Sequence, residues 1–473
     1  MDQGAAGRKA DDPASTGRTS AGQRLGADYW KLLLSSGMTN LADGIGLVAW
    51  PWLASLITRD PLAIALVGVA QRLPWFILSL PAGVIIDRLD RRQIVIAMDA
   101  LRCLMLAVLT LAIALPGTMP PVPLAGFPVL ALYGLLLFSA LVTGSAEVLR
   151  DSSAGTLLPA IVPRDRLETA NARMFGLEVL TNMMIGPSLA GFLLALALPL
   201  VFGLTGVAFA LAGLLVFSIR GPFRATRRVT QGIDANPHAD GGRGQPTVGA
   251  TGFIGEAKEG LAYLFARPLL RDLALGLGCF NALENMLLIA LVLYAQEVLH
   301  LGSAGYGLLL TGGAVGGLAA ALVGERFIRL FGQAACLRLA VAILLLQAVV
   351  PLVLPFPEPI WLTLALFSAM GTVWNIITVS LRQRLIPAHL LGRVTSVYRL
   401  FGLGMIPLGF VLSGLTVTVT EPLVGRHAAL CAPFALAAVL VALLLATLWR
   451  RLSPAAIAAF VSTAAGDEPE AAR

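Results

Sequence analysis

Long apolar runs separated by short polar segments make up most of this chain. Twelve of them reach or approach the roughly 20 residues that a helix needs to cross the hydrocarbon core of a bilayer. They cover residues 32–57, 62–86, 94–115, 127–149, 174–197, 199–219, 269–293, 304–323, 334–355, 360–380, 394–418 and 428–449. Because lipid cannot bond free backbone N–H and C=O groups, such segments cross membranes as helices. The sequence therefore predicts an all-α polytopic membrane protein with twelve transmembrane helices.

The charged residues support this prediction and give it an orientation. The mean hydropathy of +0.82 and the 13% charged residues exclude an ordinary soluble domain. The net charge of +7 could suggest a nucleic-acid partner. With the N-terminus in the cytoplasm, however, 30 of the 34 lysines and arginines fall in the tails, in cytoplasmic loops or at adjoining helix ends. This is the positive-inside pattern, so we expect both termini in the cytoplasm, the inner (plasma) membrane as the location, and no nucleic-acid partner.

A polar segment, 221–250, divides the runs into two sets of six. We expect a disordered cytoplasmic tail (1–28), an N-terminal six-helix bundle (29–220), a cytoplasmic linker with a surface helix (221–267), a C-terminal six-helix bundle (268–450) and a second cytoplasmic tail (451–473). The sequence Arg173-Met-Phe-Gly176 is repeated as Arg399-Leu-Phe-Gly402 in the second set. Two repeated bundles imply a binding site between them near the middle of the membrane. We expect the protein to be a monomer.

Residues typical of catalysis or cofactor binding do not form recognisable patterns. The four cysteines all lie in apolar runs without paired spacing, which favours packing roles. The histidines have no metal-ligand spacing, and no lysine lies in a Walker motif. We therefore predict no catalytic residue, no metal and no cofactor. Transport energy, if any is used, has to come from a gradient.

A short charged turn joins the second and third runs. Residues 83–92 read Gly-Val-Ile-Ile-Asp-Arg-Leu-Asp-Arg-Arg. So few residues make the two flanking helices adjacent and antiparallel, and the charges place the turn at a membrane surface. A glycine such as Gly83 allows close helix approach, and Asp87 and Arg88 can bond to helix ends.

This turn resembles the signature loop of the major facilitator superfamily, with Asp90 at a position where the family usually has glycine. The resemblance implies the major facilitator fold, with a small-molecule substrate moved through the lipid bilayer by alternating access. It also implies that Gly83, Asp87, Arg88, Arg91 and Arg92 form a cytoplasmic gate.

Ionisable residues inside membrane spans are costly and are candidates for function. Asp43 lies about 17 Å along the first span, close to its middle. It is a candidate proton or substrate site, and a structural hydrogen bond is the alternative. Arg72, near the middle of the second span, is the expected partner of Asp43. Its alternatives are a substrate or coupling role and a purely structural ion pair.

Other polar residues in the spans are weaker candidates. Asp99 and Arg102 share one face of the third span, and we favour a brace for the signature loop over transport chemistry. Glu178 in span five is expected to line a cavity. Asn281 and Glu284 in span seven, with a neighbouring asparagine, are expected to do the same, and interhelical hydrogen bonding is the alternative.

Span five contains Gly186, Pro187 and Gly191 in an arrangement that resembles the antiporter motif of drug exporters in the same superfamily. Asn182 and Ala190 replace two of that motif's glycines. We expect a pliant, tightly packed segment facing the other half, and a plain proline kink is the alternative. Run four, 127–149, contains no arginine, unlike many proton-coupled members of the family.

The first half is most similar to the branch that contains enterobactin exporters and macrolide efflux proteins. This resemblance implies a secondary transporter that exports amphipathic drug, macrolide or siderophore-type molecules, with protons as the exchanged ion. A facilitator or importer of a metabolite is the alternative on the same fold. A membrane enzyme and a non-transporting receptor are the rivals from other classes.

Overall fold

The computed structural model describes residues 25–115, 127–221, 223, 250–386, 388–452 and 455. Within these ranges the chain is helical, and twelve helical segments are long and apolar enough to cross a membrane. The predicted fold class is confirmed. The predicted tails, apart from 25–28, 451, 452 and 455, and most of the predicted linker lie outside the described residues.

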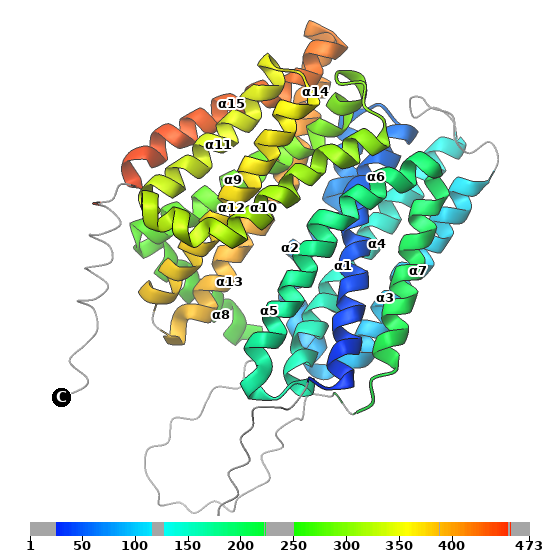
Figure 1. The fold of residues 1–473 in the computed structure, drawn as a ribbon, viewed down its shortest axis with the longest axis vertical. Coiled ribbons are helices and arrows are strands. Elements are labelled where there is room, and N and C mark those ends of the chain that lie inside the picture. The colour runs from blue at the N-terminus through cyan, green and yellow to red at the C-terminus, as the bar shows by residue number, and fades with distance from the viewer. Residues whose placement is uncertain are drawn as a thin grey trace, which may run out of the picture.

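The two sets of helices lie side by side, with α1–α7 on one side and α9–α15 on the other (Figure 1). The first set consists of α1 (Ala27–Ile57), α2 (Pro61–Arg88), α3 (Arg91–Ala114), α4 (Phe127–Ile161), η1 (Arg164–Arg166), α5 (Leu167–Glu178), η2 (Val179–Ile185), α6 (Gly186–Leu196) and α7 (Leu198–Phe217). The segment α8 (Ala250–Ala266) precedes the second set. That set consists of α9 (Pro268–Glu297), α10 (Ser303–Phe331), α11 (Gln333–Val353), α12 (Pro357–Leu385), α13 (Ala388–Gly404), α14 (Ile406–Val424) and α15 (Arg426–Arg451).

Large apolar side chains cover much of the outside of both sets. Leu111, Leu214, Leu322 and Leu423 are all more than half exposed. In water such a surface would be unfavourable, but in a bilayer it faces lipid at little cost. Hydrophobicity therefore does not by itself hold these helices together, so packing and polar contacts must do so.

Small residues provide that packing where helices cross closely. Gly316 of α10 lies directly against the backbone of Ala365 in α12, so that a Cβ at position 316 would overlap the Ala365 carbonyl oxygen. At Gly312, one turn earlier, a Cβ would lie 2.4 Å from the Trp361 carbonyl oxygen. The spacing of small residues in α10 thus serves helix packing, as in other membrane helices.

The two sets contact each other chiefly at one end, which we call the distal end. It carries the turns at 58–60, 298–302 and 425, and it lies opposite the end where α1 begins (Figure 1). There α6 packs on α10, where Gly191 meets Gly307, and α14 packs on α2, where Gly414 meets Leu62. Glycine permits both approaches because a Cβ at Gly191 would lie 2.8 Å from the Gly307 Cα.

A charged cluster closes the distal end across the two sets. Arg426 donates to Glu297 through Nε and Nη2, both at 3.0 Å, and to the backbone oxygen of Arg59 at 2.8 Å. The Arg59 guanidinium donates in turn to Gln296. Charge-assisted bonds of this kind are among the stronger contacts at a protein surface, and here they connect the first helix pair to α9 and α15.

Gly316→Ala should destabilise the fold, because the new methyl group would overlap the Ala365 carbonyl and force α10 and α12 apart. We expect a loss of about 1–3 kcal/mol, measured by unfolding of the protein in mixed micelles. Gly313→Ala is the matched control on the same helix, since its Cβ would meet only the Ser368 Cβ at 4.0 Å. Equal stability of the two variants would contradict this account of the packing.

Candidate functional site

A cavity of about 420 Å³ lies at the centre of the first set, with one wall from the second. Most lining residues come from α1, α2, α3, α4, span five and α7, while Arg399, Leu403 and Ile406 come from α13 and α14. The lining combines aromatic rings such as Trp50, Trp75 and Phe209 with charged and amide groups. A pocket of this size and mixture is suited to a small amphipathic molecule.

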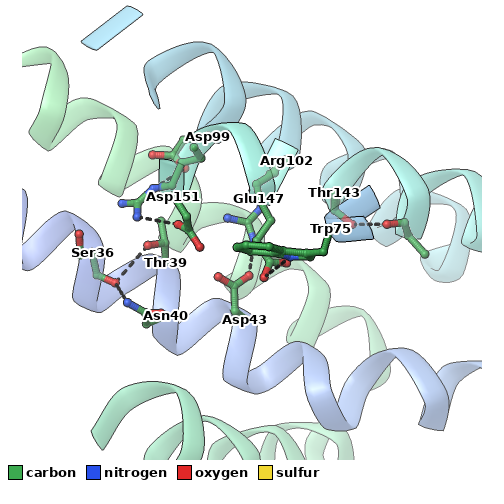
Figure 2. Close-up of polar contacts among 12 residues, drawn as sticks. Ser36, Thr39, Asn40, Asp43, Trp75, Asp99, Arg102, Thr143, Glu147 and Asp151 are labelled. Atoms are coloured by element: carbon green, nitrogen blue, oxygen red, sulfur yellow. Dashed lines mark hydrogen bonds and ion pairs between the residues drawn. The ribbon is translucent and has the colours of Figure 1, made fainter. Parts of the chain in front are cut away.

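Asp43 and Arg102 form an ion pair in the cavity wall. The Arg102 Nη2 donates to the Asp43 carboxylate, and its guanidinium stacks 3.8 Å from the centre of the Phe209 ring. Asp43 points from α1 toward Arg102 and Glu147 (Figure 2). The prediction that Arg72 is the partner of Asp43 was therefore wrong. The predicted role of Arg102 as a brace for the signature loop was also wrong, because this side chain points to the cavity.

Arg72 pairs instead with Glu147 of α4. Their closest charged atoms, Nη1 and Oε1, are 3.6 Å apart, and the Trp75 indole Nε1–H donates to the same oxygen at 3.3 Å. All three side chains line the cavity. The cavity wall therefore carries two acid–arginine pairs, each joining a different pair of helices.

Arg150 links three helices beneath the cavity. It lies in α4 and is almost fully buried. Its Nε is 3.6 Å from the carboxylate of Asp99 in α3, its Nη2 donates to the Ser35 hydroxyl of α1 at 3.2 Å, and its Nη1 donates to Asp151 at 3.2 Å. The expectation that span four lacks an arginine was wrong, because α4 continues to Ile161, well past the apolar run. Asp99 braces α4, and among the described residues it forms no ion pair or hydrogen bond with the signature loop.

Span five changes its helical form beside the cavity. Residues Val179–Ile185 form a π-helical segment immediately before Gly186 and Pro187. Glu178, just before the π-helical segment, and Asn182, within it, both line the cavity, as expected for Glu178. Gly186 packs against Gly44 of α1, where a Cβ would come within 2.7 Å of the backbone. This segment is more than a proline kink, since it packs on α1 and, through Gly191, on α10 of the other set.

The signature turn holds neighbouring helix ends together through Arg91 and Arg92. The Arg92 Nε donates to the Val216 carbonyl at 3.2 Å and its Nη2 donates to the Phe217 carbonyl, at the end of α7. Arg91 donates to the Thr156 carbonyl of α4 at 3.3 Å. These bonds satisfy backbone oxygens that a helix end leaves free.

Of the other four residues of the turn that were singled out, Gly83, Arg88 and Asp90 form no bond to the ends of neighbouring helices beyond α2 and α3 in the described residues. Asp90 is the N-cap of α3 and accepts from the Arg92 and Gln93 amides at 3.0 and 3.3 Å, which explains an aspartate where glycine is usual. A Cβ at Gly83 would meet nothing within 4 Å, so the expected close helix approach there was wrong. Arg88 is exposed as the last residue of α2, and the side chain of Asp87 lies outside the described part.

Asn281 and Glu284 do not line the cavity, contrary to expectation. Asn281 donates to the Gly402 carbonyl of α13 at 2.9 Å, which is the interhelical bonding named as the alternative. The Glu284 carboxyl lies next to the side chain of Gln347 of α11. Both residues belong to the interior of the second set.

Several functional candidates escaped the sequence analysis. Glu147, Asp151 and Arg399 line the cavity, and Arg150 supports it. Arg150 and Asp151 fell just beyond the predicted run 127–149, whereas Glu147 and Arg399 lay inside predicted runs and were not singled out as site residues. The spacing of Glu147, Arg150 and Asp151 places them within about one helical turn, which could have marked a polar face on a longer fourth helix. Within the described ranges, no group of three or more His, Cys, Asp or Glu side chains is placed to hold a metal ion.

The chain matches known proteins over most of its length. Residues 32–410 match the Major Facilitator Superfamily. The chain is 26% identical over 393 residues to the multidrug efflux pump Tap of Mycolicibacterium fortuitum, a match that covers 81% of this chain and 88% of that protein.

Solved structures show the same fold at low identity. A mutant of the nucleoside transporter NupG is 11% identical with a TM-score of 0.66, covering 90% of this chain and 99% of that one. A bacterial homologue of the iron transporter ferroportin, in an inward-facing state, is 20% identical with a TM-score of 0.61, covering 89% and 100%.

Replacing Arg150 alone should destabilise the protein strongly. In Arg150→Met, Asp99 stays buried without its arginine, and breaking a buried pair in this way costs about 3 kcal/mol or more. Asp99→Asn combined with Arg150→Met should recover much of that loss, because no buried charge remains. Unfolding in mixed micelles measures both variants, with Arg88→Met as the exposed control. Additive losses in the double variant would rule out a direct interaction of Asp99 with Arg150.

Proposed function

The chain belongs to the major facilitator superfamily, and we propose that it exports amphipathic small molecules in exchange for protons by alternating access. Membership of this family, together with the similarity to an efflux pump, makes the protein a multi-pass membrane transporter of a small molecule and not an enzyme. What we propose beyond this is the direction (export), the exchanged ion (protons) and the class of substrate (amphipathic small molecules).

The Asp43–Arg102 pair in the cavity wall carries the proposal. A carboxylate bonded to an arginine inside a membrane can give up that bond when a proton or a cationic substrate competes for it. The pair lies among aromatic rings that can hold the apolar part of a substrate, such as Phe209 and Trp50. The relative named a multidrug efflux pump supports export of such molecules.

The arrangement of contacts fits one state of an alternating-access cycle. Glycine contacts and the Arg426 cluster join the two sets at the distal end. The positive-inside rule predicts that both termini lie in the cytoplasm. In this orientation the distal end, which lies opposite the start of α1, faces outward. The structure then corresponds to a monomer closed to the outside, ready to load substrate from the cytoplasm or membrane.

Asp43→Asn should remove the proton that is exchanged at this residue. The amide keeps the shape of the side chain but cannot take up a proton as the carboxylate does. In everted vesicles, wild type should release protons from the lumen when a transported dye, macrolide or siderophore is added, and Asp43→Asn should release clearly fewer protons per dye. A fluorescent pH indicator in the lumen and dye flux in the same vesicles provide the two readouts.

Asp28→Asn is the matched control, because Asp28 lies on the same helix in a partly exposed pair with Lys31. It should behave as wild type does. Dye flux without proton movement in wild type, unchanged in Asp43→Asn, would overturn antiport and favour the facilitator. Net dye movement only into cells would reverse the proposed direction.

Arg426→Gln should make the distal end open more often. The change removes charge-assisted bonds to Glu297 that contribute about 1.5–3 kcal/mol, so the population open at that end should rise about tenfold or more. Spin labels placed at residues 59 and 302 would report the distance across that end. Lys31→Gln, at the opposite end, is the control. An unchanged distance distribution would show that the glycine contacts alone keep this end closed.

A further inference from the structure

Acidic side chains in the interior of this protein almost all have an arginine beside them. Asp43 has Arg102, Glu147 has Arg72, and Asp99 has Arg150. In the second set, Asp272 lies 3.0 Å from Arg451, and Glu297 lies 3.0 Å from Arg426. This pairing is expected, since an isolated charge inside a membrane is costly.

Glu284, near the middle of α9, forms no ion pair in the described ranges. Glu178 forms none either, but its side chain is exposed and lines the cavity. The side chain next to the Glu284 carboxyl is that of Gln347, and the Glu284 Oε2 is buried without a hydrogen-bond partner. Oε1 of Gln347 is also buried and without a partner. A charged carboxylate with one neutral partner and one free oxygen is unfavourable in such a place, so the group needs a bound cation, and a proton is the smallest one that fits.

Among the described side chains, none around Glu284 supplies a positive charge to replace that proton. Helix α9 packs against α1, α2, α8, α11, α13, α14 and α15, and its Phe280 stacks on Trp374 of α12. The charged or titratable described side chains of these helices and of α9 make no ion pair or hydrogen bond with Glu284. They are Asp28, Tyr29, Lys31, Asp43, Arg72, Arg88, Lys258, Glu259, Tyr263, Arg271, Asp272, Cys279, Tyr294, Glu297, Cys336, Arg338, Glu358, Arg382, Arg393, Tyr398, Arg399, Glu421, Arg426, His427, Cys431 and Arg451.

The residues next to Glu284 connect it to the cavity wall. Asn281, one turn before it, donates to the Gly402 carbonyl, directly before the cavity-lining Leu403. Ala282 meets Gly409 of α14 so closely that a Cβ at 409 would overlap its carbonyl oxygen. A change in the position of span eleven during transport therefore acts directly on the turn of α9 that carries Glu284.

We propose that Glu284, with Gln347, forms a second proton-binding site in the C-terminal half, separate from the cavity. Glu284 holds a proton in the state described here. When span eleven moves, the site gains access to water and the proton leaves, so that the carboxylate is charged in the other state. This inference rests on the proposed proton antiport and adds a second exchanged proton to it.

Dicyclohexylcarbodiimide tests the protonation of Glu284 in the wild-type protein. This apolar reagent takes the proton of a buried carboxylic acid, the carboxylate oxygen then adds to its central carbon, and rearrangement gives a stable acylurea that contains every atom of both reactants. Mass spectrometry of peptides should show the adduct on Glu284 at neutral pH, decreasing as the pH is raised. Exposed Glu325 should remain unmodified. An unmodified Glu284 would overturn the proposal.

Glu284→Gln tests the role in coupling, because glutamine mimics the protonated acid permanently. In everted vesicles, dye–dye counterflow should continue, while proton release per dye should fall by about half, since one of two exchange sites is lost. Glu325→Gln is the matched control and should release as many protons as wild type. If Glu284→Gln does not fold, vesicles of carbodiimide-treated wild type replace it, and proton release should fall as the adduct on Glu284 increases.

The two proposals fail in different ways. Proton release that is normal in wild type and equal in Glu284→Gln overturns the second site and leaves antiport through Asp43 intact. The absence of dye-driven proton release in wild type overturns antiport itself, and the coupling role of Glu284 with it. Loss of counterflow in a folded Glu284→Gln would place Glu284 in substrate binding and likewise overturn a separate proton site.

Discussion

The cost of burying charge in a membrane is the constraint on which the interior of the N-terminal half depends. Three acids there, Asp43, Glu147 and Asp99, each have an arginine from another helix, namely Arg102, Arg72 and Arg150. Because each pair joins different helices, satisfying the charges also fixes how α1, α3 and α4 lie relative to one another. The same pairs give the cavity its polar wall, so stability and binding depend on the same contacts.

Close packing of small residues complements these pairs. Lipid removes most of the hydrophobic drive for helices to associate, so contact area and backbone proximity matter more than in water. The two halves meet through Gly191 with Gly307 and through Gly414 with Leu62. Such contacts involve few polar groups, so they can separate and re-form without leaving buried charges unpaired. The polar part of the distal contact, around Arg426, lies where water can replace its bonds.

The sequence predicted the fold well, because hydropathy and positive-inside charge report directly on membrane crossing. Residue partners were less predictable. Asp43 and Arg72 lie on neighbouring spans, but helix rotation turns Asp43 toward Arg102 and Arg72 toward Glu147. Arg150 was missed because the predicted run stopped at Leu149, before Arg150 and Asp151, whereas α4 continues to Ile161, since its backbone stays hydrogen-bonded and these charges find partners. The ion-pair partners of each residue depend on how the helices rotate and pack in the folded bundle, which the sequence pattern does not reveal.

One acid of the C-terminal half, Glu284, differs from the paired acids of the cavity wall, and this difference bears on mechanism. In the cavity wall, arginines neutralise Asp43 and Glu147, so the charge of Asp43 changes when a proton or substrate displaces Arg102. In the C-terminal half, Glu284 has a neutral amide partner, so its charge depends on a proton. A half with fixed countercharges is suited to holding substrate, while a half with a protonatable, unpaired acid is suited to sensing the gradient. Span eleven, which contacts both the cavity and the Glu284 turn, is the element through which the two can be linked.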